Sequence, residues 1–351
     1  MKIARRIALR PSRAQRKALA RHSGASRWAY NWGLRRKQEE HAAGRKTPTA
    51  IDLHKEVVGL KHRPAEDGGA PWLCEVSKCA PQEALRDLDV AYGRFFAKRG
   101  RHPKFHAKRP GEGGFRLTGS IRIEDGCVTL PRLGRLRIQP GCRGYASSGI
   151  YGSARLVQEH GEWFCSVLEA VPCEPPSVAP DALAEVGLDL GARKLAVLAS
   201  PDGGIEIFPN RRALLRATRK LRAAQRVVAR RKKGSGRRRR AVRCLGRVHR
   251  RVARVRRDMT HKATAKIAAR YKVVAMEDLR VGNMTRRAHG KGRRAKSGLN
   301  RVVLDANLGE FRRQLTYKLA LRGGRIVFVS PAYSSQRCSH CGDYNDPGSS
   351  E

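Results

Sequence analysis

The sequence predicts a multidomain α+β fold: a small β-barrel with a helical region beside it, followed by an α/β domain. Residues 113–172 carry short apolar runs of period 2 separated by glycine-containing turns, a pattern typical of a small antiparallel barrel. Residues 172–182 are rich in proline and predict a linker. After residue 183, apolar strands alternate with amphipathic helical stretches, which indicates an α/β domain.

The chain before the linker begins with a strand and a helix. Residues 2–9 predict a strand, and Ser12 with Gln15 forms the S-x-x-Q capping box that opens a helix. A basic helical region continues to about residue 100. Residues 154–170 predict a hairpin that turns at His160 and Gly161. Arginines on the alternate face of these strands either contact a nucleic-acid backbone or form a solvated face, and their spacing fits both.

The domain after the linker starts with three strands in meander order, residues 185–191, 194–200 and 205–208. Further strands are expected at residues 272–279 and 325–330, with a basic loop after the first of these. An amphipathic helix is expected at residues 304–323, and glycines stop it.

Residues 211–257 contain 22 Lys or Arg and no Asp or Glu. Apolar residues recur at spacings of three and four in each half, so we expect a hairpin of two amphipathic helices broken at residues 231–240. A solvated charged face is the usual explanation of such runs. Here all charges have one sign, and like charges at helical spacing destabilise a helix unless they are neutralised, which favours contact with a polyanion. The basic residues predicted to bind nucleic acid are Arg231, Lys232, Lys233, Arg237, Arg238, Arg239, Arg240, Arg247, Arg250, Arg251, Arg286 and Arg287.

The composition of the whole chain supports a nucleic-acid partner. The 351 residues contain 75 Lys and Arg against 30 Asp and Glu, a net charge of +45. Arginines are 55 of these cations, and guanidinium groups bind phosphate in a bidentate manner and stack on bases. Base composition of the genome can also enrich arginine. An anionic membrane surface is a weaker candidate, because arginine suits RNA or DNA better than lipid headgroups. No apolar run approaches the ~18 residues of a membrane span.

The amino-terminal residues have no continuous apolar segment, so we expect no signal peptide and a cytoplasmic location. The nine cysteines are too sparse for a disulfide scaffold. Only Cys338 and Cys341 form a C-x-x-C pair, which predicts half of a zinc site, because structural zinc requires four ligands. A redox pair is the alternative, although the helix that usually follows such a motif is missing.

Two carboxylates lie at the ends of apolar strands. Asp189 and Glu277 would be costly to bury unless they are paired or bind metal. Adjacent strand ends can bring such carboxylates together to hold two Mg²⁺ about 3.5–4 Å apart, which suits phosphodiester hydrolysis. The alternative is a pair of ordinary strand-terminal acids, as Asp278 is expected to be.

The residues GLDLGARKLAVL, VVAMEDLRVGNM, LDANLGEFRRQLTYKLALRGGRIVFV and SSQRCSHCG, in this order, resemble the TnpB family. These are RNA-guided DNA endonucleases encoded by insertion sequences, long described as transposases and related to type V CRISPR effectors. The resemblance covers nearly the whole chain. It implies guide RNA and target DNA as partners, DNA recombination and transposition as the setting, a nucleoid-associated protein, and neither a membrane nor a small-molecule substrate.

The resemblance also implies a domain order. Residues 1–10 and 106–175 would form a wedge-like barrel, and residues 11–105 an inserted helical recognition lobe. Residues 183–351 would form a RuvC-like nuclease domain of RNase H-like topology, with an incomplete zinc ribbon at 338–351. Asp189 and Glu277 match the first and second catalytic carboxylates of the family.

The sequence departs from the family pattern at its carboxyl end. Members continue to a second C-x-x-C and a third catalytic Asp, and neither occurs here. We therefore expect a truncated member with weakened Mg²⁺ binding and impaired cleavage. The alternative is a nuclease-dead RNA-guided DNA-binding protein or repressor. A third hypothesis, a basic structural RNA-binding protein, would not require Asp189 and Glu277 to converge.

Overall fold

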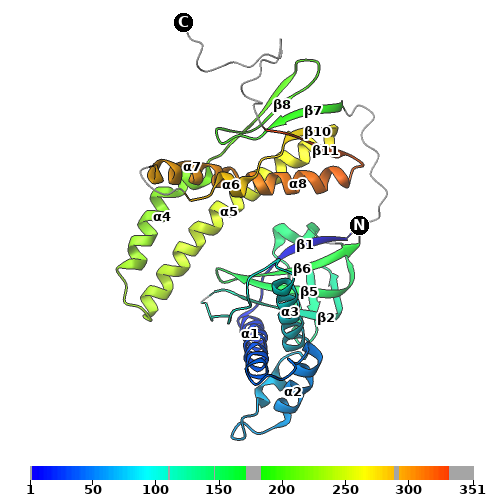
Figure 1. The fold of residues 1–351 in the computed structure, drawn as a ribbon, viewed down its shortest axis with the longest axis vertical. Helices are drawn as coiled ribbons and strands as arrows, with labels where there is room; N and C mark the ends of the chain where they lie inside the picture. The colour runs from blue at the N-terminus through cyan, green and yellow to red at the C-terminus, as the bar shows by residue number, and fades with distance from the viewer. Residues whose placement is uncertain (1, 110, 146, 171–182, 288–291, 332–351) are drawn as a thin grey trace. The chain divides into compact units, whose positions relative to one another are not determined.

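The computed structural model describes residues 2–109, 111–145, 147–170, 183–287 and 292–331. The chain divides into two compact units, Met1–Pro172 and Cys173–Glu351, which we call the first and second units (Figure 1). The division falls at the start of the proline-rich stretch from which the sequence predicts a linker.

The first unit combines an antiparallel sheet with a group of helices (Figure 1). Its strands are β1 (Lys2–Leu9), β2 (Gly113–Glu124), β3 (Cys127–Leu130), β4 (Gly134–Arg137), β5 (Gly149–Glu159) and β6 (Glu162–Ala170). Its helices are α1 (Arg13–Ala42), α2 (Ala50–His62) and α3 (Cys79–Phe96), with 3-10 turns η1 (Pro71–Glu75) and η2 (Pro140–Tyr145).

The sheet of the first unit has the order β1-β6-β5-β2-β3-β4, and its two edge strands meet. The Arg10 N–H donates to the Arg137 carbonyl at 2.7 Å, and the Gln139 N–H donates to the Ala8 carbonyl at 2.9 Å. These bonds join the outer strands at one corner. Trp163 is fully buried in the core that the sheet encloses. The predicted hairpin at residues 154–170 is confirmed by the β5–β6 pairing.

Helix α1 begins with the predicted capping box. The Gln15 N–H donates to the Ser12 hydroxyl at 3.2 Å, and the Ser12 N–H donates to the Gln15 side chain at 2.9 Å. The helix packs closely on α3 at Gly33, where an added Cβ would lie 2.7 Å from a Leu85 methyl group. Leu34 and Leu85 belong to a second apolar core among the helices.

The second unit has strands β7 (Leu183–Asp189), β8 (Lys194–Ala199), β9 (Ile205–Pro209), β10 (Tyr271–Glu277) and β11 (Arg325–Val329). Its helices are α4 (Ala213–Ala229), α5 (Gly236–Arg270), α6 (Val281–Met284), α7 (Arg293–Ala306) and α8 (Leu308–Ala320). The sheet order is β11-β10-β7-β8-β9, with β10 and β11 parallel to β7 and with β7, β8 and β9 in the predicted antiparallel meander. Leu188, Met276, Ile267 and Phe311 belong to one core, so α5 and α8 cover one face of this sheet.

Two predictions for the second unit are wrong in detail. The helix expected at residues 304–323 begins at Leu308, because Asn307 adopts the left-handed conformation (φ 60°, ψ 37°) and separates two helices. Residues 293–298, expected as part of the basic loop, belong instead to α7, which spans residues 293–306. Its buried Val303 and Ala306 lie three residues apart, as one face of a helix requires, and this spacing outweighs Gly298 and the basic composition.

Candidate active site and nucleic-acid interface

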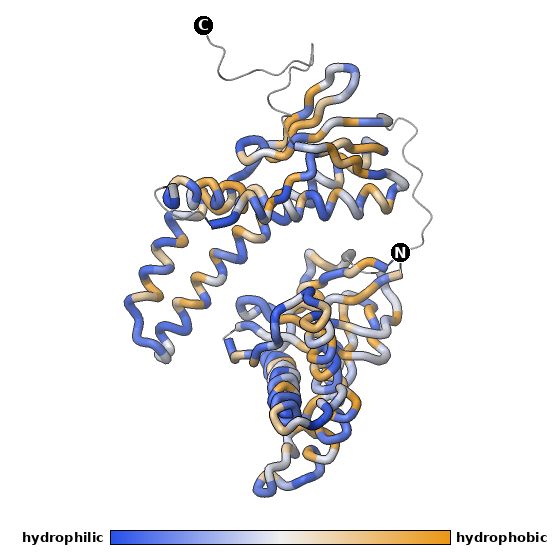
Figure 2. Tube along the Cα trace, viewed as in Figure 1, coloured by the Kyte–Doolittle hydropathy of each residue, from blue (hydrophilic) through white to orange (hydrophobic). Residues whose placement is uncertain are grey.

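The basic stretch forms the predicted helical hairpin, α4 and α5, although α5 extends 13 residues beyond the expected end at residue 257. Figure 2 shows hydrophilic and apolar stretches that alternate along both helices. The Ser235 hydroxyl accepts from the Arg238 N–H at 3.1 Å and caps α5. The Arg238 guanidinium donates to the carbonyls of Val228 (2.6 Å) and Arg231 (3.2 Å), so this arginine closes the turn of the hairpin.

Most of the predicted nucleic-acid contacts lie on the surface of the second unit. Within the hairpin the exposed ones are Arg231, Lys232, Lys233, Arg237, Arg239, Arg240, Arg247 and Arg251. No described carboxylate lies within ion-pairing distance of these eight side chains. Arg250 is half-buried, and Arg286 and Arg287 are exposed just after α6, outside the hairpin. The hairpin therefore presents a cationic surface that the described carboxylates of its own unit do not neutralise.

A buried carboxylate fastens the base of the hairpin. Asp305 of α7 is 4% exposed and accepts from the N–H groups of Leu214 (3.0 Å) and Leu215 (3.3 Å) in the first turn of α4. It also accepts from the Arg256 guanidinium of α5 at 2.7 Å. No side chain at the N-cap position, Arg212, caps α4, so Asp305 supplies that cap from 91 residues away. One side chain thus joins three helices.

The two predicted carboxylates meet at one edge of the second sheet. Asp189 ends β7 and Glu277 ends β10, and these strands are parallel neighbours with Leu188 opposite Met276. Asp189 and Glu277, which follow these two residues, therefore also lie side by side. Side chains alternate along a strand, so both carboxylates lie on the face opposite the buried Leu188 and Met276.

The electrostatics agree with this proximity. Burial raises the pKa of Asp189, and the charge of Glu277 raises it further, while a backbone N–H at Leu190 acts in the opposite direction. Asp189 still has an exposed surface, so solvent and ligands can reach it. Two carboxylates that repel one another at accessible strand ends are suited to a divalent cation, which prefers oxygen ligands.

The other predicted metal ligands are not placed. Cys338 and Cys341 lie outside the described residues. Among the residues that the structure does describe, no group of three or more His, Cys, Asp or Glu side chains is arranged to hold a metal ion.

Comparison with known proteins gives the family. A family model described as "Probable transposase" matches residues 170–288. The chain is 35% identical to "Putative RNA-guided DNA endonuclease InsQ" of Escherichia coli (strain K12), over 95% of this chain and 82% of the relative. It is 31% identical to "Putative RNA-guided DNA endonuclease MT2953" of Mycobacterium tuberculosis, over 98% and 80% respectively. The chain belongs to the TnpB family.

Two further family models match parts of this TnpB-family chain. One described as a helix-turn-helix domain matches residues 1–46, where the structure has strand β1 and the single long helix α1 over residues 2–42. One described as "Cas12f1-like, TNB domain" matches residues 309–350. A solved structure of a Cas12f1-sgRNA-target DNA complex contains a similar chain, with 12% identity, a TM-score of 0.48, and coverage of 99% of this chain and 92% of that one.

Two features of this TnpB-family chain escaped the sequence analysis. Asp305 has no predicted role, although an acid among the apolar residues of LDANL signals a buried polar partner. Lys318 of α8 is half-buried and donates to the His261 carbonyl (2.8 Å) and the Thr264 hydroxyl (2.7 Å), and burial lowers its pKa to about 8. No helix in the described part of the chain is long and apolar enough to cross a membrane.

Proposed function

We propose that this chain is an RNA-guided DNA endonuclease whose phosphodiester hydrolysis depends on Mg²⁺. The observation that carries the proposal is the convergence of Asp189 and Glu277 at the ends of adjacent parallel strands. The strand order, an antiparallel meander followed by two parallel strands, supports a RuvC-like domain of RNase H-like topology. The names of the curated relatives point to the same activity.

Asp189 and Glu277 are the residues that would hold Mg²⁺. The metal ion, when bound, would activate water and stabilise the leaving 3′ oxygen of a phosphodiester. The protein's own contribution is to fix two carboxylates on rigid strands, with the apolar core of the unit directly behind them. Because Glu277 raises the pKa of Asp189, a bound divalent cation would relieve an existing repulsion.

Guide RNA and target DNA are the partners we propose for the cationic surface. The exposed arginines of the hairpin would contact phosphates and would therefore contribute affinity without reading sequence. Sequence would be read by pairing between guide and target, as in other RNA-guided systems. The wedge-like barrel, the zinc site at Cys338 and Cys341, and a cytoplasmic, nucleoid-associated location remain predictions that accompany this proposal.

Reconstitution tests the activity. The full chain, loaded with a guide RNA transcribed from its own locus, is incubated with matched target DNA, with and without Mg²⁺. Cleavage should require Mg²⁺ and should be lost in Asp189→Ala and Glu277→Ala. Asp202→Ala is the matched control, because Asp202 lies in the turn between β8 and β9 and accepts only from the Gly204 N–H among the described residues.

The same experiment separates the alternative function. Guide-dependent binding without cleavage would support an RNA-guided DNA-binding protein or repressor. Cleavage that survives Asp189→Ala would refute the assignment of the two carboxylates. Binding of RNA with no dependence on a matched target would favour the third hypothesis, a structural RNA-binding protein.

A further inference from the structure

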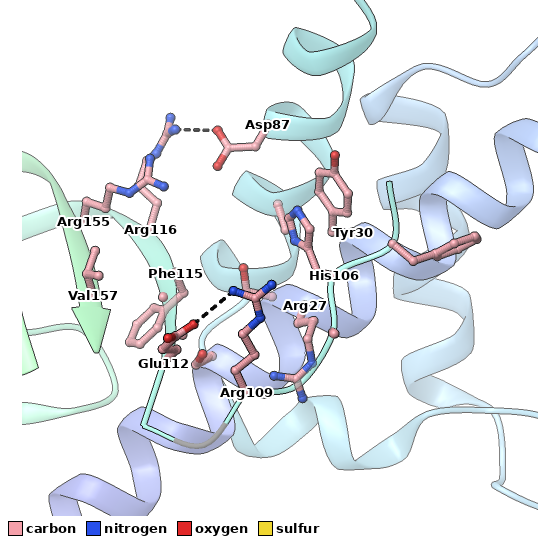
Figure 3. Close-up of a pocket in the computed structure, with 17 residues that line it drawn as sticks. Arg27, Tyr30, Asp87, His106, Arg109, Glu112, Phe115, Arg116, Arg155 and Val157 are labelled. Carbon is pink, nitrogen blue, oxygen red and sulfur yellow. Dashed lines mark hydrogen bonds and ion pairs between the residues drawn. The ribbon is translucent and has the colours of Figure 1, made fainter. Parts of the chain in front are cut away.

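The first unit contains a cavity of about 470 Å³ that the proposed nuclease site does not use (Figure 3). Side chains from α1 and α3 line it on one side, and side chains from β2 and β5 on the other. Residues 105–109, which lead into β2, complete the wall. The volume is typical of a site for one small molecule and too small for a nucleic-acid duplex.

Flat ring systems form part of the wall. Tyr30 and His106 stack with ring centroids 3.9 Å apart and planes within 9° (Figure 3). The backbone of His106 is fixed by Asn31, which donates to its carbonyl (3.0 Å) and accepts from its N–H (2.7 Å). Phe105 also lines the cavity and is 51% exposed, so part of its ring surface is accessible to a ligand.

Cations line the cavity as well, and two of them have no acidic partner among the residues that the structure describes. Arg116 pairs with Asp87, and Arg109 pairs with Glu112 at 3.6 Å (Figure 3). No described carboxylate forms an ion pair with Arg27 or Arg155. Burial lowers the pKa of His106 and the charge of Arg27 lowers it further, while Asp87 acts in the opposite direction. The net effect favours the neutral imidazole, which can both donate and accept a hydrogen bond.

We propose that this cavity binds one unpaired nucleotide of a single-stranded nucleic acid. Base stacking on Phe105 or beside the Tyr30–His106 pair and phosphate contact with Arg27 and Arg155 account for the rings and the unpaired cations together. A base must leave the helix to enter a cavity of this size, so duplex DNA is excluded as the ligand. The guide RNA is the source we favour, a choice that rests on the proposed function. An unpaired DNA strand offers the same chemistry.

Fluorescence anisotropy on the full chain tests the proposal. The probes are a labelled 12-nucleotide single-stranded RNA, DNA of the same sequence, and the corresponding DNA duplex. Measurements at about 0.3 M NaCl weaken the sequence-independent phosphate contacts of the hairpin. The buffer contains no divalent cation, so the result does not depend on whether the chain cuts DNA.

Two pairs of variants separate the pocket from the rest of the surface. Phe105→Ala should weaken RNA binding at least about fivefold, the smallest effect of one lost stacking contact, and leave duplex binding unchanged. Phe96→Ala is its control, because Phe96 is 73% exposed and lies outside the cavity. Arg27→Ala should reduce the salt dependence of RNA binding by about 0.7 in log–log slope, the value of one phosphate contact. Its control is Arg35→Ala, on the same helix but outside the cavity, which should leave the salt dependence of RNA binding unchanged.

The outcomes decide the proposal. The proposal is overturned if Phe105→Ala weakens RNA binding no more than Phe96→Ala does. It is also overturned if Phe105→Ala weakens duplex DNA binding as much as RNA binding. If Phe105→Ala weakens binding of the single-stranded DNA alone, the pocket is supported and its nucleotide is assigned to DNA rather than RNA. Failure here would leave the assignment of Asp189 and Glu277 untouched, and absence of cleavage would leave the pocket untouched.

Discussion

Replacing Asp305 by alanine should loosen the cationic hairpin from the second unit. The carboxylate is almost fully buried and accepts from two backbone N–H groups of α4 and from the Arg256 guanidinium. Alanine leaves all of these donors without a partner. The first turn of α4 loses its only described side-chain cap, and a partly buried guanidinium keeps its charge with no carboxylate beside it.

The expected loss is about 3–4 kcal/mol. Removal of a helix cap costs about 1 kcal/mol. Removal of one partner of a buried ion pair costs about 3–5 kcal/mol. The Arg256 side chain is 23% exposed, so water replaces part of the interaction that its guanidinium loses. The two costs arise from the same carboxylate, so they are not simply added. In a unit of this size, 3–4 kcal/mol lowers the Tm by about 6–16 °C. Asp305→Asn keeps the volume and one acceptor, and about half of the loss is expected.

Calorimetric unfolding of the full chain measures this, with Asp258→Ala as the matched control. Asp258 lies on α5 and forms an exposed ion pair with Lys262, which is worth at most about 1 kcal/mol. Hydrogen exchange should show faster exchange of the Leu214 and Leu215 amides in Asp305→Ala. The reasoning is refuted if Asp305→Ala and Asp258→Ala unfold at the same temperature, or if the α4 amides exchange at the wild-type rate.

Three further predictions concern charges. Because the pKa of Asp189 is raised in the folded state, its ionisation opposes folding above about pH 4. Asp189→Asn should therefore raise the Tm measured in EDTA at pH 7, and in the separate Mg²⁺ assay it should abolish cleavage. An unchanged or lower Tm contradicts this. The folded-state pKa of Lys318 is about 8 against 10.5, so the folded chain binds fewer protons in that window. Lys318→Met should therefore stabilise the chain at pH 7, by about 1–2 kcal/mol once the full shift is reduced for the solvent that screens this half-exposed side chain. Denaturant titration should show this gain shrinking from pH 8 to pH 10.5, and a pH-independent gain would refute the cause. Replacing Arg237, Arg239 and Arg240 together by alanine should lower the salt slope of duplex binding by up to about 2.7, and no change would exclude them from the interface.

The part of the candidate site that the sequence predicted is the part that depends on local pattern. An acid that ends an apolar strand is visible in one window of sequence, and the parallel pairing of β7 with β10 then places Asp189 beside Glu277. Likewise, the three-and-four spacing of apolar residues was sufficient to predict the hairpin. The pairing of the two strands itself was an inference from element order and not from either strand.

What the sequence did not predict depends on contacts between distant residues. The role of Asp305 requires α4, α5 and α7 to meet, and the first six residues of α7 were expected as a loop. The cavity of the first unit brings Arg27 of α1 and Arg155 of β5 to one wall, 128 positions apart in the chain. Local sequence periodicity does not predict such an arrangement, because neither arginine stands out from the residues next to it in the sequence.

The hairpin shows why the net charge and the fold have to be considered together. Leu221 is the only buried residue of α4 beyond its first position, so most of this helix is held only by its contact with α5 (Figure 1). The base of the hairpin is fixed by Asp305, whereas its turn is closed by the Arg238 guanidinium and carries exposed Arg231, Lys232 and Lys233. Self-repulsion is therefore greatest where packing is least. A ligand that binds only the folded hairpin stabilises it by mass action, so a polyanion would stabilise the turn most and the base, already anchored, least.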